Sequence, residues 1–298
     1  MSETSASSRG PALAALVFGA CAIGFAPILV RLTETGPAAA GFWRLFLALP
    51  LLALMALRDG QGVRTAPSKM MLLAGLFFAL DLSFWHYGVK LTSVANATVL
   101  TNLSPVVVTV AAWFLFRERP GRIFIAGLVL AISGAATMAM AADKGQAINA
   151  PLGDILSLFT AVWYAFYFLA MRKARQGAGA SRAMFWSTLV SAPMLLIVAL
   201  AFGEDIIPAG QAGWWACIGL AAVHVAGQGS IAWALGRLPA SIASVVVLAQ
   251  PVVAAVFGWI LFSEALTPLQ MLGGVLTLAG VVIAQRAPVL RAPAQRAQ

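Results

Sequence analysis

Ten apolar stretches of about twenty residues constrain the fold of this chain more than any other feature of its sequence. A helix of about 20 apolar residues crosses the hydrocarbon core of a bilayer, and backbone inside that core must satisfy its own hydrogen bonds. Strands of a membrane barrel would alternate apolar and polar residues, and these stretches do not. The sequence therefore predicts an all-α polytopic membrane protein with ten transmembrane helices. The stretches are residues 12–32, 38–57, 70–90, 94–116, 121–141, 152–171, 183–202, 212–235, 240–262 and 268–285.

The composition supports this prediction and excludes several other classes of protein. Hydrophobic residues make up 61% of the chain and charged residues 10%, against about 25% charged residues in an ordinary soluble domain. So few charges cannot cover a soluble exterior. A soluble enzyme, a nucleic-acid-binding module and a disordered chain are therefore excluded. The net charge of +9 does not indicate a nucleic-acid partner, because the basic residues form short clusters between the apolar stretches.

The sequence holds no motif that indicates catalysis, a metal or a cofactor. Neither His-Glu-x-x-His nor Gly-x-Ser-x-Gly nor a phosphate-binding loop occurs in it. Cys21 and Cys217 both lie inside apolar stretches, where cysteine is typically a small buried hydrophobe and not a disulfide or metal ligand. We therefore expect a protein that is not an enzyme and that binds no metal and no cofactor.

The distribution of Lys and Arg predicts the orientation in the membrane. If the N-terminus is cytoplasmic, the cytoplasmic segments carry 15 Lys and Arg residues and the opposite segments carry three, Arg31, Lys90 and Lys144. Basic residues concentrate on the cytoplasmic side of membrane proteins, so both termini are expected in the cytoplasm. The apolar run to Leu32 is longer than the core of a cleaved signal peptide, so it is interpreted as a retained first span.

An internal repeat divides the chain into two halves. A shift of 146 residues places residues 93–137 on residues 239–283 with 14 identical positions of 45 and no gap. Composition bias explains matches of Ala, Val or Leu, but it does not explain matches of Pro, Trp, Glu and Gly. These matched pairs are Pro105 with Pro251, Trp113 with Trp259, Glu118 with Glu264, Gly127 with Gly273, and Gly134 with Gly280.

Two five-helix repeats follow from this match, the first over residues 1–146 and the second over residues 147–298. Because five is odd, the second repeat must enter the membrane upside down relative to the first. Inverted repeats are typical of secondary transporters. Duplication in a purely structural membrane protein is the alternative.

The residues around the two matched prolines resemble a known repeat. Asn102–Val107 with Trp113–Arg119, and Ala249–Val253 with Leu261–Glu264, resemble the EamA repeat of the drug/metabolite transporter (DMT) superfamily. The resemblance covers nearly the whole chain. It implies a carrier, usually an exporter, in a bacterial inner membrane, with a central cavity between spans 1, 3, 4, 6, 8 and 9. Members handle amino acids, nucleobases, sugars and other metabolites. The preferred branch is the YddG-like aromatic amino acid exporters.

Polar residues inside the spans are the candidates for a binding site, because they are costly in a bilayer. Asp81 is the only carboxylate near the middle of a span, and Trp85 shares its helix face. Asp81 could pair with a substrate ammonium or carry a proton, or it could be a structural partner of a neighbouring helix. Arg44 is expected to snorkel or to neutralise Glu34, with a substrate carboxylate as the alternative partner.

Side-chain amides beside the matched prolines form a second group of candidates. Asn102 lies just before Pro105, and Gln250 precedes Pro251. Proline interrupts a helix, and broken helices at the midplane are where transporters bind substrate. Amides offer donors and acceptors to a zwitterion, although they could instead satisfy the freed carbonyls.

Aromatic and polar residues of the sixth and eighth spans complete the candidate site. Trp163 and Tyr167 lie along one stripe and would stack on an aromatic or large apolar substrate, or else pack in the core. His224 and Gln228 recur at helical spacing, and Gln228 is the better candidate for the cavity.

Prolines and glycines predict how the spans move and pack. Glycines that stand seven residues apart are expected to bring the fifth and tenth spans close together or to pack either span against the rest of the bundle. Glu118 and Glu264 are interpreted as helix-end anchors or gate contacts. Prolines in five spans are expected to act as hinges, namely Pro27, Pro50, Pro105, Pro193 and Pro251.

The sequence as a whole predicts a secondary transporter that exports amino acids, aromatic or large neutral ones first, by alternating access. The expected partners are a small-molecule substrate and the lipid bilayer, with no nucleic acid and with a monomeric chain. A DMT exporter of a nucleobase, sugar or drug-like compound is the main alternative. An ion channel would need a continuous polar path, and an intramembrane enzyme would need a carboxylate partner for Asp81.

Overall fold

The computed structural model describes residues 4–59, 62–92, 94–141, 148–262, 266–287 and 290–291. Within these residues, ten helices or helix pairs are long and apolar enough to cross a membrane. The predicted all-α, ten-span fold is thus confirmed, with boundaries within a few residues of those expected. The observed spans are Arg9–Val30, Pro37–Arg58, Lys69–Gly88, Ala97–Phe116, Arg122–Met140, Ala150–Ala174, Ala180–Ala201, Gln211–Leu235, Ala240–Leu261 and Pro268–Arg286.

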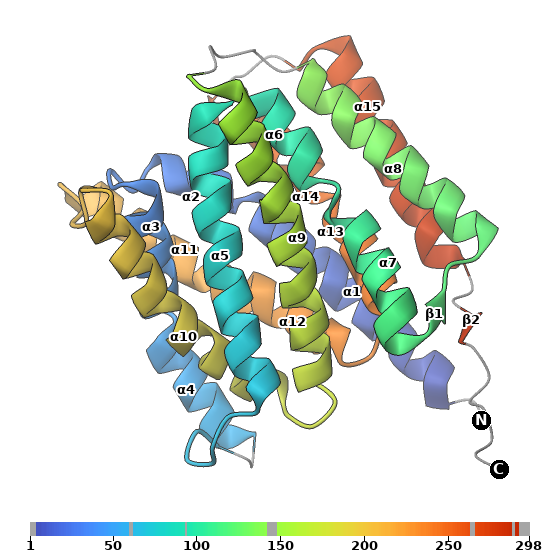
Figure 1. Cartoon of the computed structure of the whole chain (residues 1–298), viewed down its shortest axis with the longest axis horizontal. Coiled ribbons are helices and arrows are strands. Elements are labelled where there is room, and N and C mark those ends of the chain that lie inside the picture. Colours follow the sequence, from blue (N-terminus) through green and yellow to red (C-terminus); the bar gives the residue numbers. More distant parts are fainter. Residues whose placement is uncertain are drawn as a thin grey trace.

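Five spans are single continuous helices (Figure 1). Their continuity follows from uninterrupted apolar sequence with helix caps at the ends, such as the Ser68 hydroxyl that accepts a hydrogen bond from the Met71 amide. They are α5 (Lys69–Leu91), α8 (Arg122–Met140), α9 (Ala150–Ala174), α10 (Ala180–Ala201) and α15 (Pro268–Arg286).

The other five spans are interrupted. Four of them consist of two consecutive α-helices, and the eighth passes through one turn of π-helix. The pairs are α1 (Thr4–Gly24) with α2 (Ala26–Arg31), α3 (Pro37–Phe46) with α4 (Leu49–Arg58), α6 (Val94–Thr101) with α7 (Ser104–Phe116), and α13 (Ala240–Val247) with α14 (Gln250–Phe262). The eighth span is α11 (Gln211–Val223), η1 (His224–Gln228) and α12 (Gly229–Leu235).

Proline explains four of the five interruptions. Pro27, Pro50, Pro105 and Pro251 each stand at the second position of the helix that follows a break. This place suits proline, because the amide that it lacks has no partner in the first helical turn anyway. Pro193 differs, since α10 continues through it without a break. Neighbouring helices and local adjustment tolerate such a proline in a membrane helix, and hinge motion at Pro193 stays a prediction.

Helices α8 and α15 lie side by side along one edge of the molecule (Figure 1). Glycine permits this approach: a Cβ atom on Gly134 would come within 2.4 Å of the Thr277 amide nitrogen, and one on Gly280 within 2.3 Å of the Ala131 nitrogen. The predicted packing of the fifth span on the tenth is confirmed, because any side chain at these positions would separate the two backbones.

One short element was not expected from the sequence. Strand β1 (Glu118–Arg119) follows α7 and pairs antiparallel with β2 (Leu290–Arg291), with Glu118 opposite Arg291. The ladder joins the end of the fourth span to the segment after the tenth. It adds two residues per strand to an otherwise helical fold.

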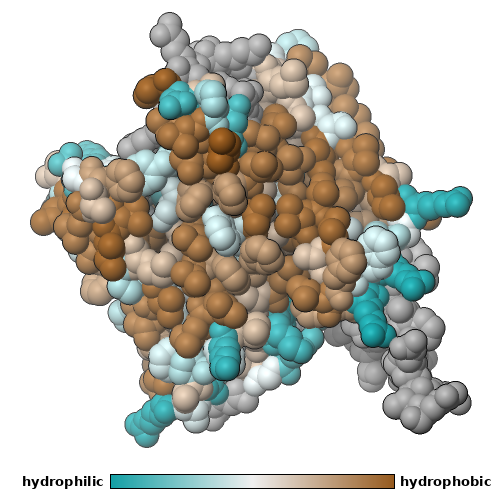
Figure 2. Space-filling view, in the orientation of Figure 1, coloured by the Kyte–Doolittle hydropathy of each residue, from teal (hydrophilic) through white to brown (hydrophobic). Residues whose placement is uncertain are grey.

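The outer surface matches a lipid environment. Apolar side chains cover most of the face in Figure 2, and hydrophilic residues gather toward the ends of the spans. Large apolar residues such as Phe114 and Trp215 are 74% and 70% exposed, which a soluble protein would avoid over such an area. The end that carries Arg58, Arg117 and Arg172 is called the basic end below, and the other the opposite end.

Candidate functional site

Charged and hydrogen-bonding side chains from five spans meet in the middle of the helix bundle. We call them the central polar cluster and describe them from the spans that hold them. The members are Arg44 of α3, Asp81 of α5, Tyr164 and Tyr167 of α9, His224 and Gln228 of η1, and Gln250 of α14.

The π-helical turn directs Gln228 toward α9 and His224 toward α10. Gln228 Nε2 donates a hydrogen bond to Tyr167 Oη at 2.8 Å, and His224 Nε2 lies 2.9 Å from the Thr188 hydroxyl of α10. A π-turn brings residues four apart close to one face, and such turns are frequent at functional sites. This contact brings together Gln228 and Tyr167, two of the residues expected at the cavity, and substrate contact by either stays a prediction.

Glycine lets the first span pack against this turn. A Cβ atom on Gly227 would lie 2.9 Å from Ile23 Cγ1, and one on Gly19 would lie 2.6 Å from the Gly227 carbonyl oxygen. The π-turn therefore packs directly against α1. Tyr167, His224 and Gln228 are each 1% exposed, so protein encloses the cluster in this conformation.

Two opposite charges lie in the same region without pairing. Arg44 and Asp81 are 8% and 7% exposed, and they interact electrostatically with each other. Within the described part of the chain, no hydrogen bond or ion pair reaches either charged group. The Arg44 guanidinium lies 6.0 Å from the centre of the Phe78 ring, and that ring is 4.8 Å from Tyr167.

The expected role of Arg44 is corrected by its position. Snorkelling to the surface would leave it exposed, yet its side chain is buried. Glu34 does not take it as a partner: Glu34 Oε2 accepts a hydrogen bond from the Gly210 amide at 3.1 Å. The reason is that α3 turns Arg44 inward, toward Phe78 and Asp81, so the arginine belongs to the central polar cluster.

The two amides beside the prolines are placed differently. Gln250 is the first residue of α14, and its side chain faces Tyr164. Asn102 stands in the break between α6 and α7, where its buried Nδ2 has no hydrogen-bond partner among the described residues. The structure thus brings Gln250 to the cluster, whereas a role of Asn102 in binding stays a prediction.

The two tryptophans of the candidate site lie outside the cluster. Trp163 packs among aromatic rings between α5 and α9, 6.1 Å from Phe77 and 6.0 Å from Phe84, and it contacts the exposed Phe159. Trp85 packs against His86 at 5.0 Å. Trp163 and Tyr167 therefore belong to different groups of side chains, and substrate contact by either tryptophan stays a prediction.

Sequence reasoning gave Arg44, Tyr164 and His224 no place among the site residues. Arg44 is the one basic residue well inside an apolar stretch and away from its ends, a signal that by itself marks a functional candidate. His224 carried the same helical spacing as Gln228 but was ranked below it. Helical spacing cannot say which polar residues of different spans meet, so it did not select Tyr164.

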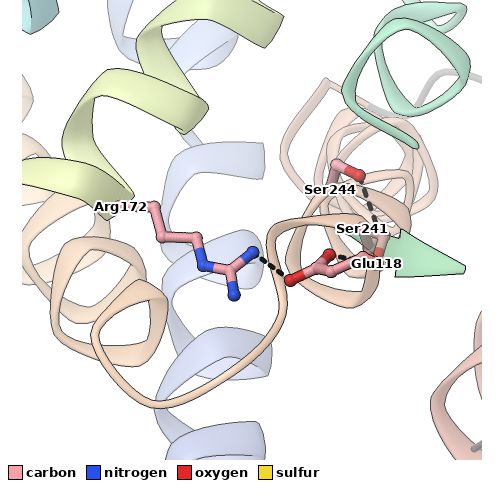
Figure 3. A network of polar contacts seen from close by, with 4 residues as sticks. All are labelled: Glu118, Arg172, Ser241 and Ser244. Carbon is pink, nitrogen blue, oxygen red and sulfur yellow. Dashed lines mark hydrogen bonds and ion pairs between the residues drawn. The ribbon is translucent and has the colours of Figure 1, made fainter. Parts of the chain in front are cut away.

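A second buried polar network closes the basic end (Figure 3). Glu118, directly after α7, forms an ion pair with Arg172 of α9 and accepts a hydrogen bond from the Ser241 hydroxyl of α13 at 3.0 Å. The Ser244 hydroxyl donates to the Ser241 carbonyl at 2.9 Å, and the Arg172 guanidinium lies 4.4 Å from the centre of the Phe116 ring. We call this network the Glu118 latch. It agrees with the expected anchor or gate role of Glu118, whereas Glu264 lies outside the described residues.

Hydrogen bonds also join the two halves of the chain at the opposite end. Glu204, after α10, accepts one from Tyr87 Oη at 2.8 Å and one from the Ala39 amide at 2.9 Å. Trp43 Nε1 donates to the Ile206 carbonyl at 2.7 Å. Contacts between the two halves of the chain thus lie at both ends of the helix bundle, with the central polar cluster between them.

Comparison with known proteins identifies the family. One family model, that of the EamA-like transporters, matches residues 10–140 and again residues 151–285. The chain belongs to the EamA-like transporter family. It is therefore a transporter of the DMT superfamily and a multi-pass membrane protein, not an enzyme, as the sequence predicted.

Relatives of this EamA-like transporter are other transporters. It is 24% identical to the pseudopaline exporter CntI of Pseudomonas aeruginosa over 82% of this chain and 84% of that protein. It is 27% identical to a "probable terminal-alkyne amino-acid exporter" of Streptantibioticus cattleyicolor over 88% of both chains. An uncharacterized transporter of Archaeoglobus fulgidus is 26% identical over 92% of this chain and 96% of its own.

A solved structure shares the fold of this EamA-like transporter. It is described only as the crystal structure of a protein, and it superposes with a TM-score of 0.79 at 18% identity, over 93% of this chain and 97% of the other. The arrangement of ten spans is therefore one that occurs in an experimentally determined structure.

Proposed function

We propose that this EamA-like transporter exports amino acids, aromatic or large neutral ones first, by alternating access around the central polar cluster. The observation that carries the proposal is the cluster itself, in which a buried cation, a buried carboxylate and neutral donors and acceptors meet between spans. A zwitterion needs this mixture of charges and hydrogen-bonding groups. Two relatives named as exporters, one of them of an amino acid, support the direction and the substrate class.

We infer that the halves 1–146 and 147–298 are inverted repeats. The matched prolines Pro105 and Pro251 both open the second helix of a broken span. Packing of the matched glycines of α8 and α15 against each other gives the pair an approximate symmetry. The two matches of one family model to the two halves support the same inference.

Alternating access on this fold needs two gates. The Glu118 latch joins the first half to the second at the basic end, and the Glu204 contacts do so at the opposite end. In the proposed cycle one set opens while the other holds, and the prolines at the helix breaks supply the hinges. By the positive-inside rule, the basic end and both termini are proposed to face the cytoplasm. The membrane is proposed to be the bacterial inner membrane. The chain is proposed to work as a monomer, because both halves of the cluster come from one polypeptide.

Counterflow in proteoliposomes tests the proposed substrate class. Purified protein is reconstituted with unlabelled phenylalanine inside, and uptake of labelled phenylalanine is measured against empty liposomes. Uptake above that background, reduced by unlabelled large neutral amino acids, is the expected result. A folded protein that carries none of phenylalanine, leucine, threonine, lysine and glutamate would contradict the proposal.

A pair of matched variants tests the position of the site. Gln228→Leu removes the amide that donates to Tyr167, and Gln211→Leu makes the same change at the exposed start of α11. Loss of a buried donor used in binding lowers the transport rate at least about tenfold. The rate of Gln228→Leu should therefore fall by that factor, and the rate of Gln211→Leu should stay near that of the wild type. Equal transport rates for the two variants would show that the Gln228 side chain of η1 is not part of the binding site.

A further inference from the structure

Arg44 and Asp81 form an exception among the buried charges of this protein. Charged groups inside a bilayer are expensive and normally find a partner. Arg172 pairs with Glu118, and Arg182 donates hydrogen bonds to the Thr65 and Ala66 carbonyl oxygens at 3.1 and 2.8 Å. Arg44 and Asp81 are buried to the same degree, yet no hydrogen bond or ion pair satisfies either of them within the described residues.

The positions of the two groups explain how one bound ligand could satisfy both charges. They come from neighbouring helices, α3 and α5, which contact each other. They attract each other and lie within electrostatic range of the same two hydroxyls, those of Tyr164 and Tyr167. Even so, their charged atoms are more than 4.0 Å apart, since no ion pair joins them. A pair of opposite charges that face one region without touching is complementary to a ligand that carries both signs.

The chemistry of the two groups selects the ligand class. A guanidinium presents a planar fork of donors that matches a carboxylate. A carboxylate accepts hydrogen bonds from an ammonium. In an α-amino acid these two groups are separated by a single carbon atom, so one ligand can reach both side chains. The Phe78 ring lies 6.0 Å from the Arg44 guanidinium, at the outer range of a cation–π interaction.

We propose that Arg44 binds the carboxylate and Asp81 the ammonium of an α-amino acid substrate. The proposal rests on the proposed function and adds the recognition of the head group, which is common to all α-amino acids. The substrate side chain is then selected elsewhere in the cluster. Asp81 serves as a substrate contact in this scheme, and Arg44 is the specificity-determining residue for the acid group.

Analogues that lack one charge test the proposal on the wild-type protein. Labelled phenylalanine counterflow is challenged with phenylethylamine, which lacks the carboxylate, and with 3-phenylpropionate, which lacks the ammonium. A buried site built for a polar group rejects analogues that lack it by large factors, so each should compete at least about 100-fold more weakly than phenylalanine. Competition by either analogue within tenfold of phenylalanine would overturn the proposal while leaving amino acid transport intact.

Substitutions then assign each charge to its group. Asp81→Asn should weaken phenylalanine transport and relax the rejection of 3-phenylpropionate only. Arg44→Gln should relax the rejection of phenylethylamine only, and Arg44→Lys should restore part of the discrimination. Asp205→Asn, the same change at an exposed position, is the matched control. A purely structural role would lower transport in both variants without this crossed pattern, and that result would overturn the assignment.

The outcomes separate the two proposals. If no amino acid shows counterflow, both the proposed function and the head-group assignment are contradicted. If counterflow occurs but the analogues that lack one charge compete as well as phenylalanine, only the head-group assignment is contradicted. If a variant fails to fold, the analogue competition on the wild-type protein still decides.

Discussion

The Glu118 latch and the Arg44–Asp81 pair both contain buried charges, but only the charges of the latch have direct partners among the described residues. Glu118 is 2% exposed and has both a guanidinium and a hydroxyl as partners. Asp81 is 7% exposed and has no direct partner among the described residues. An unpaired buried charge costs free energy, whereas the charges of the latch are satisfied within the protein. This difference supports the proposal that the Arg44–Asp81 pair binds a substrate.

The largest expected loss of stability comes from breaking the latch. Glu118→Ala leaves Arg172 buried without its carboxylate, which should cost about 3 to 5 kcal/mol of unfolding free energy. The measurement is the Tm of the purified protein in detergent. Replacing both partners, as in Glu118→Leu with Arg172→Met, should recover most of the loss. An unchanged Tm for Glu118→Ala would mean that the latch does not hold the two halves together.

A smaller loss is expected from the hydroxyl of the latch. Ser241→Ala removes a hydrogen bond to the Glu118 carboxylate, and hydrogen bonds to charged groups contribute about 1.5 to 3 kcal/mol. Ser244→Ala is the control, because the Ser244 hydroxyl donates only to the Ser241 carbonyl of its own helix. The two variants are compared by Tm under identical conditions. Equal losses would indicate general packing effects at α13 and not a contribution to the ion pair.

The neutral part of the central polar cluster should contribute less than the latch. Tyr167→Phe removes the acceptor of the Gln228 amide, and an uncharged hydrogen bond contributes about 1 kcal/mol. We expect a modest drop in Tm with a clear drop in phenylalanine counterflow, because Tyr167 lies beside both charges. A drop in Tm as large as that of Glu118→Ala would show that the cluster serves the fold as much as the latch does.

The smallest change in stability is expected at Asp81. Asp81→Asn removes a buried charge that has no direct partner, so the Tm should stay within error of the wild type or rise, while transport falls. Glu118→Gln is the matched variant, in which the same loss of charge breaks a satisfied ion pair. A larger drop in Tm for Asp81→Asn than for Glu118→Gln would reverse the comparison between the two sites.

Much of the fold could be predicted from the sequence, because bilayer thickness and backbone hydrogen bonding leave one solution for each apolar stretch. Breaks at Pro27, Pro50, Pro105 and Pro251 followed from the chemistry of proline. Pro193 shows the limit of that rule, since α10 continues through this proline without a break. The close approach of α8 and α15 at Gly134 and Gly273 was one of the two alternatives that the glycine spacing left open.

The candidate site was predicted only in part. Asp81, Tyr167, Gln228 and Gln250 were selected as polar or aromatic residues inside spans, and the structure brings them toward one region. Trp163 met the same criterion but packs with Phe77 and Phe84. Helical spacing gives the face of one helix and says nothing about which neighbour that face meets.

The sequence by itself determined the ten spans and the family, and it indicated the four helix breaks at proline. The spans depend on the thickness of the bilayer and the breaks on local backbone chemistry. Only the tertiary structure decided which charges are paired. Glu118 meets Arg172 across 54 residues of chain, whereas Arg44 and Asp81 are closer in sequence and remain apart. Pairing depends on where side chains of different spans arrive in the packed bundle, and no periodicity within a single span records that position.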